Sequence, residues 1–600
     1  MPRAGNPLPH RWGKVVTALA VTVAAGCLAA QVPAAFGAPR AASAAVPAAV
    51  ADAARVETPL TSTSPVSGVL VSQVSLHLPL PASASAHPAA CDWVSYLRFR
   101  DRNGPGNAAD ADRILVAQPG ILEGASAFDS VARNTITQAA KAGKHVEFWA
   151  LDRRSNCLED HTGVQAALAA KDIGVAIDYY YHHKSIGGKS FPGYVEGDGL
   201  AFLQNVGLEQ TLRDEYDLLR HELPDPATRK KKVLCGGHSL GGTITGYFAG
   251  WDFDGDPATT DDLGFNQCAG YFALDTFIST KVVSPEQQPL PDEAEAGIQL
   301  GAPAVDIGLA TGAIPRTLAL PAVINPETMN LLALAGVAAD VGPSAASTLA
   351  NQVPSSLNVD LTYRLLGSKD VGNFVSGSPG LRDFHLTNQA ALGFLLDDNS
   401  MPLAFLQTSV GFFDGGPVAD KNFPVGNDLS ALPADVRGLF TAATGTDYKA
   451  VPTSTSASYT WRNYDQMAGL TAKSKDGKPF TDATKEVSDV QEVARSLAEY
   501  PLDFTEAYFP TRLVSDIELG TQVDTVKRHY LRTDGVSQNP VLTILAGDGL
   551  TKGMTGLDPL HPVILPGYQH LDVLTAATPQ NGGGAEQGAA HLATFAADPQ

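Results

Sequence analysis

A short apolar run leads directly into a glycine-rich turn at residues 232–242, and this join constrains the fold more than any other feature. The run Lys-Val-Leu-Cys has strand character, and Gly-Gly-His-Ser-Leu-Gly-Gly follows it at once. Helical spacing of apolar residues then continues to Trp251. A serine between a buried strand and a helix, flanked by glycines that leave room for a strained backbone, predicts a sharp turn with Ser239 at its tip.

Strand-like and helix-like segments alternate on both sides of this turn. Strands are expected at residues 69–78, 91–100, 113–118, 144–151, 232–235, 270–275, 540–546 and 561–565, and helical spacing at 127–142 and 163–223. Such alternation predicts an α/β fold, with a mainly parallel sheet covered by helices on both faces.

The alternation is lost between about residues 279 and 539, where proline and glycine are frequent and helix patterns are scattered. We interpret this stretch as a large, partly helical lid insertion in one α/β domain. The expected organisation is a signal peptide at 1–40, an Ala/Pro/Ser linker at 41–65, the core at 66–280 and 540–578, the insertion at 281–539, and a flexible tail at 579–600.

The N-terminus has the pattern of an export signal. Arg3, Arg11 and Lys14 precede an uncharged apolar run over residues 15–30, which is short for a membrane span. We therefore expect a secreted chain without a transmembrane span, with lipid anchoring at Cys27 as the alternative. The formal charge of −21 argues against nucleic acid as a partner.

Four cysteines follow the signal: Cys91, Cys157, Cys235 and Cys268. An even number in an exported chain permits two disulfides, with three possible pairings. Cys235 lies in an expected buried strand, so a free structural thiol is an equal alternative.

A nucleophilic serine needs a histidine to take its proton and a carboxylate to orient that histidine. The histidines after Ser239 are His385, His529, His561, His570 and His591. We favour His570, because it follows the strand at 561–565 and a Pro-Gly turn, at the carboxyl edge of the sheet.

Two aspartates compete for the role of the acid. Asp548 follows the strand at 540–546 and is favoured, while Asp275 ends the preceding core strand and is its rival. Asp572 is expected to support the histidine or to lie at the surface. For the oxyanion hole we expect the backbone N–H groups of Leu240 and Ile121, with Leu122 as the neighbour that can replace Ile121.

These segments resemble the α/β-hydrolase superfamily in order and spacing. They are Gln118-Pro-Gly120, Ala150-Leu-Asp-Arg-Arg154, Gly237-His-Ser-Leu-Gly-Gly242, Ala546-Gly-Asp548 and Gly567-Tyr-Gln-His570-Leu-Asp572. The chain looks like an exported, actinobacterial-type member with lipase or esterase character, over residues 66–280 and 540–578. It departs from the usual pattern in having Pro119-Gly120 where His-Gly is common. The resemblance implies that the insertion acts as a lid.

The function hypothesis is hydrolysis of a hydrophobic or lipid-like carboxylic ester through an acyl-enzyme, with no metal or organic cofactor. A secreted peptidase or amidase with the same triad is the alternative, and a non-catalytic binding protein on this fold is a third.

Two further patterns have simpler interpretations. The acidic loop over residues 252–262 begins like a calcium loop, but Pro257 replaces the required glycine and no glutamate closes it, so Asx turns are favoured. The tyrosines at 179–181 are expected to pack on a helix rather than to line a pocket.

Overall fold

The computed structural model describes residues 54–281, 301–319, 324–423, 449–552, 561–581 and 583–599. The expected signal peptide and Cys27 lie outside these residues. No helix within the described ranges is both long enough and apolar enough to cross a membrane.

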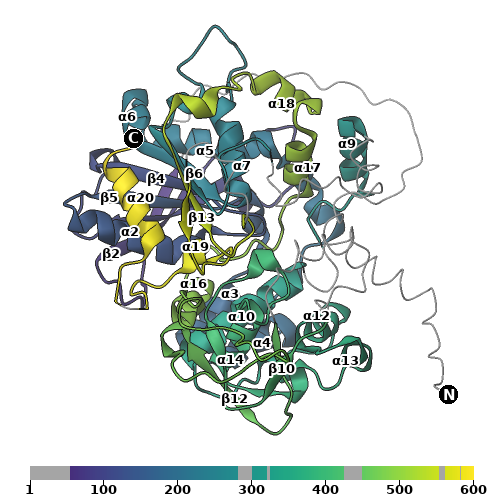
Figure 1. The fold of residues 1–600 in the computed structure, drawn as a ribbon. Helices are drawn as coiled ribbons and strands as arrows, with labels where there is room; N and C mark the ends of the chain where they lie inside the picture. The colour runs from purple at the N-terminus through teal and green to yellow at the C-terminus, as the bar shows by residue number, and fades with distance from the viewer. Residues whose placement is uncertain are drawn as a thin grey trace, which may run out of the picture.

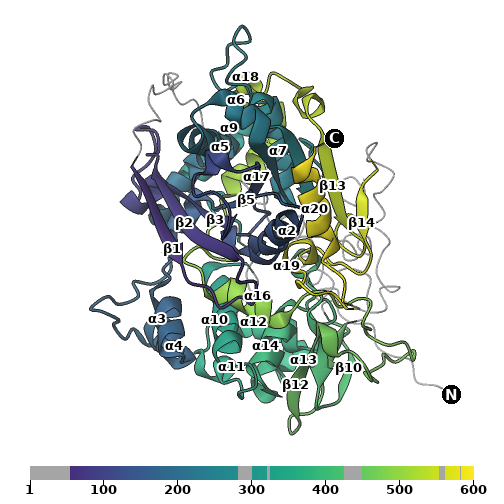
Figure 2. The ribbon, with the colours of Figure 1, turned by 90° about the vertical axis from the view of Figure 1, so that its left-hand side faces the viewer.

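A nine-stranded sheet forms the centre of the molecule, in the order β1-β2-β3-β5-β4-β6-β7-β13-β14 (Figures 1 and 2). The strands are β1 (Arg55–Leu60), β2 (Val69–His77), β3 (Trp93–Asp101), β4 (Arg113–Gln118), β5 (Val146–Leu151), β6 (Val233–His238), β7 (Gly270–Leu274), β13 (Val541–Ala546) and β14 (Val563–Leu565). From β5 to β14 all neighbours are parallel, whereas β1, β2, β3 and β5 pair antiparallel. The expectation of a mainly parallel sheet is confirmed.

Helices cover both faces of the sheet because alternate side chains of each strand point to opposite faces. On β4, Leu115 belongs to the apolar cluster with α2 (Asp129–Lys141) and α20 (Gln587–Ala597). Its neighbours Ile114 and Val116 belong to the cluster on the other face, with α5 (Leu208–Glu222) and α7 (Leu240–Gly250). Figures 1 and 2 both show α2 and α20 side by side.

The structure contradicts the linker and the flexible tail that were expected near the two ends of the chain. The linker expected at 41–65 contains β1, whose residues Arg55–Leu60 pair with β2 along their whole length. The flexible tail expected at 579–600 contains α20, which Glu586 caps by accepting from the N–H groups of Gly588 and Ala589. Leu592 and Phe595, three residues apart on α20, are buried against the sheet, so this helix is part of the core.

The insertion between β7 and β13 builds two groups of elements. One group, α9 (Gly301–Thr311), α17 (Thr511–Leu519) and α18 (Asp524–His529), lies on the side of the core that carries α5 (Figure 1). The other forms a separate lobe of α10 (Pro326–Val341), α11 (Leu349–Gln352), α12 (Leu357–Gly367), α13 (Val371–Ser376), α14 (Asn388–Leu396) and α16 (Val490–Ala498), with β8 (His385–Leu386), β9 (Gly411–Asp414), β10 (Val418–Asp420), β11 (Ala450–Pro452) and β12 (Ser458–Asn463).

The lobe also contains α3 (Thr162–Ala170) and α4 (Ile173–His182), which follow β5 in the chain (Figure 2). Both helices contact α10, so the expected boundary of the core at residue 280 does not separate core from lobe. Tyr179 and Tyr180 on α4 are buried and pack on Phe191, as expected of packing residues. The remaining short helices are α6 (Pro226–Lys232) and α19 (Asp572–Thr575). The lid role stays a prediction.

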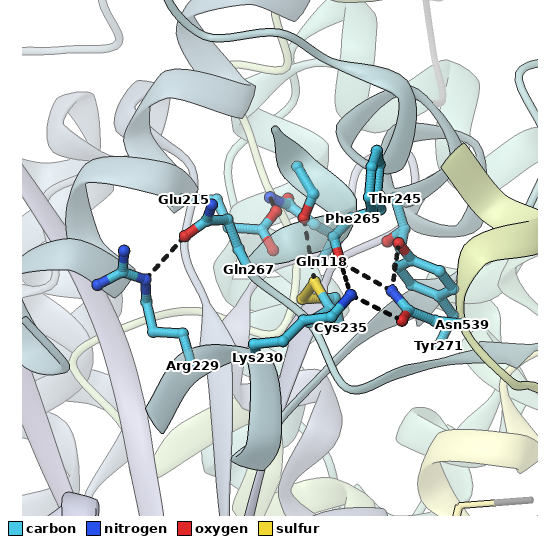
Figure 3. Close-up of a disulfide and its surroundings, with 12 residues drawn as sticks. Gln118, Glu215, Arg229, Lys230, Cys235, Thr245, Phe265, Gln267, Tyr271 and Asn539 are labelled. Carbon is cyan, nitrogen blue, oxygen red and sulfur yellow. Dashed lines mark hydrogen bonds between the residues drawn. A yellow bond between two sulfur atoms is a disulfide. The ribbon is translucent and has the colours of Figure 1, made fainter. Parts of the chain in front are cut away.

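Two disulfides join the four cysteines, Cys91 to Cys157 and Cys235 to Cys268. Cys235 is therefore not a free thiol, and the second bond ties β6 to the residue two before β7. Figure 3 shows its polar surroundings, in which Lys230 on α6 donates to the side chain of Asn539 at 3.1 Å. Both disulfides are compatible with an oxidising, extracellular location.

Glu215, beside this disulfide in Figure 3, is a buried carboxyl group on α5. Gln118 donates to it at 2.8 Å, but burial dominates and raises its pKa to about 7. The unfolded chain loses this proton near the ordinary pKa of 4.5, whereas the folded chain keeps it to about 7. The free energy of unfolding therefore falls as the pH rises through this window, by roughly 3 kcal/mol in all.

We expect Glu215→Gln to remove this loss. The difference in thermal midpoint between this variant and wild type, measured by differential scanning fluorimetry, should be several degrees more positive at pH 8 than at pH 5. Glu196→Gln, at an exposed position before the same helix, is the control and should show the same difference at both pH values. A Glu215→Gln difference that does not change with pH would contradict the assignment.

Candidate active site

Ser239 lies at the tip of a sharp turn between β6 and α7. Its backbone has φ 53° and ψ −121°, a conformation that side-chain-bearing residues rarely adopt. The turn closes because its flanking residues are glycines: a Cβ at Gly237 would lie 2.6 Å from the carbonyl oxygen of Gln118, and one at Gly241 only 2.1 Å from it. Ser239 itself is partly exposed, in contrast to its buried neighbours.

His570 and Asp275 form a buried pair beyond the same edge of the sheet. His570 Nδ1 lies 2.6 Å from Asp275 Oδ2, and both side chains are at least 98% buried. Asp275 directly follows β7, and the N–H of Ser239 donates to the carbonyl of Leu274, one residue before it. A main-chain hydrogen bond thus joins Ser239 to the residue that precedes Asp275.

The carboxylate of Asp275 is further held from the end of β13. Its Oδ1 accepts from the N–H of Ala546 at 3.0 Å and from the Thr551 hydroxyl, and its Oδ2 accepts from the N–H of Leu550 at 3.1 Å. These donors hold the buried carboxylate in place opposite His570.

The expectation that Asp548 pairs with His570 is wrong. The Asp548 carboxylate instead accepts from Lys552 at 2.6 Å and is 25% exposed. The loop after β13 turns so that Leu550 and Thr551 donate to Asp275, which leaves the Asp548 side chain on the outside of that turn. The rival aspartate from the sequence, Asp275, occupies the position beside the histidine.

A second buried pair, Glu123 and His238, supports the site and was not expected from the sequence. His238 Nδ1 lies 2.8 Å from Glu123 Oε1, and its Nε2 lies 3.0 Å from the carbonyl oxygen of His570. Glu123 also accepts from the N–H of Gly120 at 2.6 Å. Both ring nitrogens face acceptors, an arrangement that favours the doubly protonated ring, and His238 thereby links the loop after β4 to the histidine loop.

The two neighbouring imidazoles have opposite pKa shifts. Burial disfavours a charged His238, but Glu123 outweighs it and raises the pKa of His238 above its ordinary value. Burial and the adjacent positive charge of His238 together lower the pKa of His570, although Asp275 opposes them. The ring centres are 4.4 Å apart, close enough for this coupling. These shifts favour a neutral His570 beside a protonated His238.

The loop after β4, expected to carry an oxyanion donor, lies against the serine. A Cβ at Gly120 would lie 3.0 Å from the Cβ of Ser239. The N–H of Gly120 is occupied by Glu123, and Ile121 follows as a half-buried residue. Leu122 has a positive φ of 60°, so the chain reverses there. Leu240 begins α7 on the other side of Ser239.

A segment of the insertion, residues 503–506, pairs with this loop through an isolated antiparallel bridge between Glu123 and Thr505, and we call it the strap. Gly124 donates to the carbonyl of Phe504 at 2.9 Å, and Glu506 donates to that of Leu122 at 2.9 Å. Arg153, buried after β5, joins the Glu506 carboxylate at 2.6 Å and also donates to the carbonyl of Pro119. The insertion thus holds the loop in place through buried charge-assisted hydrogen bonds.

Asp572 attaches the insertion to the histidine loop. It is fully buried, so the surface alternative is wrong. Its carboxylate accepts from Thr408 at 2.7 Å, from the Ser409 hydroxyl at 2.6 Å and from Ser488 at 2.6 Å. It also accepts from the N–H of Gln569, the residue before His570, at 2.7 Å. One carboxylate therefore fixes two insertion segments to the backbone that carries His570.

The acidic loop over residues 252–262 contains the expected Asx turns. Asp254 accepts from the N–H of Asp256, and Asp256 from that of Ala258, at 2.7 and 3.0 Å. The carboxylates of Asp252, Asp254 and Asp262 also lie near one another.

Comparison with known proteins adds little to this geometry. No family profile and no curated protein matches the chain. Among solved structures, it is similar to the peroxisomal alpha-beta-hydrolase Lpx1 from Saccharomyces cerevisiae, with 10% identity, a TM-score of 0.29, and coverage of 91% of this chain and 90% of that chain. A likeness of this size carries no argument about fold or function.

Replacing each of the two aspartates by asparagine tests which one is the acid that orients His570. We expect Asp275→Asn to lower kcat/KM for an ester by at least about a thousandfold, because the amide no longer holds the histidine tautomer. Asp548→Asn, the matched variant, should stay within a few-fold of wild type. Steady-state kinetics with both proteins checks this, and the reverse order of losses would restore Asp548 as the acid.

The charge on His238 predicts a shift in the pH profile. A histidine that acts as a general base must be neutral, so with His570 in that role kcat/KM should fall as the pH drops through a midpoint below 6.5, the ordinary pKa. His238→Asn removes the neighbouring positive charge, which raises the pKa of His570 and moves the midpoint to higher pH. His529→Asn, a buried histidine that bonds the carbonyl of Asp252 instead, is the control. A midpoint that stays in place or moves to lower pH in His238→Asn would refute the coupling.

Proposed function

We propose that the chain is a serine hydrolase of the α/β-hydrolase type that cleaves carboxylic esters through an acyl-enzyme. The observation that carries this proposal is the meeting of a strained serine turn with a buried Asp275–His570 pair at one edge of a parallel sheet. The strand order β2-β3-β5-β4-β6-β7-β13-β14 supports the assignment, because it places the serine after β6 and the histidine after β14.

Each residue of the proposed triad has one task. Because the Nδ1–H of His570 is directed at Asp275, its Nε2 is the nitrogen free to accept a proton from Ser239. The serine oxygen attacks the ester carbonyl, and the protonated histidine then passes the proton to the departing alcohol. Water repeats the sequence to release the acid.

Two backbone N–H groups are proposed to stabilise the oxyanion. Leu240 begins a helix directly after the nucleophile, where its N–H has no partner within the helix. Ile121 is the second, since Glu123 already occupies the N–H of Gly120. The link from Glu123 through His238 to the carbonyl of His570 keeps this loop in register with the base.

A secreted location is part of the proposal. The export pattern at the N-terminus and the two disulfides support it. An apolar setting for the substrate is supported by the insertion, which packs leucine-rich helices beside the site.

Labelling with a fluorophosphonate probe tests the activated serine. We expect the mature protein to be labelled and Ser239→Ala to remain unlabelled, because the probe reacts only with a serine whose proton a base accepts. Wild type that folds but takes no label would favour the binding-protein alternative.

A substrate panel separates the two hydrolase classes. We expect p-nitrophenyl esters to be turned over at least about a hundredfold faster than the matching p-nitroanilides. Comparable or faster cleavage of the anilides, abolished in Ser239→Ala, would favour the peptidase or amidase alternative.

A further inference from the structure

An apolar cavity lies inside the insertion lobe, enclosed by α10, α11, α12 and α14. It contains about 1010 Å³ of space between protein atoms, part of it open to solvent. Leucines are the largest group among the lining residues, joined by Met329, Phe384 and Met401. Among the described residues, none that lines the cavity carries a charge. Such a space is unsuited to a carboxylate or a peptide backbone and suited to a hydrocarbon chain.

The cavity lies directly behind the loop that carries His570. Leu406 is one of its lining residues, and the next residue, Gln407, accepts from the N–H of Leu571 at 3.0 Å. Leu571 follows His570 in the chain. A residue of the cavity wall, Leu406, is therefore the chain neighbour of a residue that is hydrogen-bonded to the histidine loop.

A second connection runs through α14. Leu396 lines the cavity, and its carbonyl accepts from the N–H of Thr408 at 3.0 Å. The Thr408 hydroxyl donates to Asp572 at 2.7 Å. The end of α14 is thus fixed to the histidine loop by buried hydrogen bonds, so cavity and loop form one rigid arrangement.

Phe405 packs between two apolar clusters. It packs against the small apolar cluster around Met401, which lines the cavity. It also packs against the larger cluster that contains Leu122 and Leu240. Phe405 therefore lies between the apolar packing around the cavity and the core cluster to which Leu122 and Leu240 belong.

We propose that this cavity binds the acyl chain of the ester substrate, a linear aliphatic chain longer than a few carbons. The inference rests on the proposed ester hydrolysis. The ester carbonyl stays at Ser239 among polar donors, and the chain runs past Phe405 into the lobe. Each methylene that enters leaves water, which raises kcat/KM by up to about fourfold until the cavity is full. The insertion then selects the substrate class rather than only covering the site.

Filling the cavity tests the proposal without touching the catalytic groups. Ala391 on α14 lines it, and Ala391→Trp places an indole in the space. We expect kcat/KM for p-nitrophenyl laurate to fall at least about tenfold, while p-nitrophenyl acetate changes less than about twofold. Leu357→Trp, at a position of the same lobe that is 77% exposed, is the control and should resemble wild type with both esters. Ala350→Phe, on α11 in the cavity wall, repeats the test if Ala391→Trp does not fold.

A binding measurement keeps this proposal separate from the hydrolase proposal. Ser239→Ala should bind the fluorescent fatty acid cis-parinaric acid, and Ala391→Trp in the same background should weaken that binding at least about tenfold. If laurate and acetate respond equally to the filled cavity and binding is unchanged, the acyl site is refuted while ester hydrolysis stands. If wild type takes no fluorophosphonate label yet binds the fatty acid at this cavity, the hydrolase proposal fails and the apolar ligand site survives.

Discussion

The buried hydrogen bond between Asp275 and His570 is the interaction on which the rest of the site depends. Burying a carboxylate costs free energy unless hydrogen-bond donors surround it. Here one donor is the imidazole, and the others come from the end of β13 and the loop beyond it. Two parts of the chain, separated by the whole insertion, must therefore meet before the histidine has its partner.

The insertion supports the site through two attachments. The strap extends the loop beside Ser239 by main-chain pairing, and Asp572 fixes further insertion segments to the histidine loop. Both attachments are buried and charge-assisted, so removing either would leave a charge without its partners, at a cost of several kcal/mol. A lid that opens by lifting the entire insertion is incompatible with these attachments. Any opening must occur in parts of the insertion away from them.

Much of this arrangement could be predicted from local sequence. The serine turn follows from glycine spacing between a strand and a helix, and His570 from its place after the last strand. The parallel sheet follows from the alternation of short apolar runs with helical spacing. These features depend on neighbours in the chain, and local pattern is a sound guide to them.

The expectations that failed depend on contacts between distant residues. Asp548 and Asp275 each end a strand, and only the path of the loop at 547–551 decides which carboxylate faces the imidazole. Glu123 lies more than a hundred residues from His238, and no local pattern pairs them. Helix α20 is rich in alanine, and β1 lies within a stretch of mostly Ala, Pro, Ser and Thr, so composition alone resembled a tail and a linker, whereas pairing and packing order both elements.

Detection of an acyl group on Ser239 tests the central claim most directly. The protein would be mixed with p-nitrophenyl laurate, quenched in acid within milliseconds to seconds, digested and mapped by mass spectrometry. The account predicts a burst of p-nitrophenol and a lauroyl group on the peptide that contains Ser239, absent in Asp275→Asn quenched at the same times. Steady hydrolysis without a burst, or an acyl group on another residue, would contradict it.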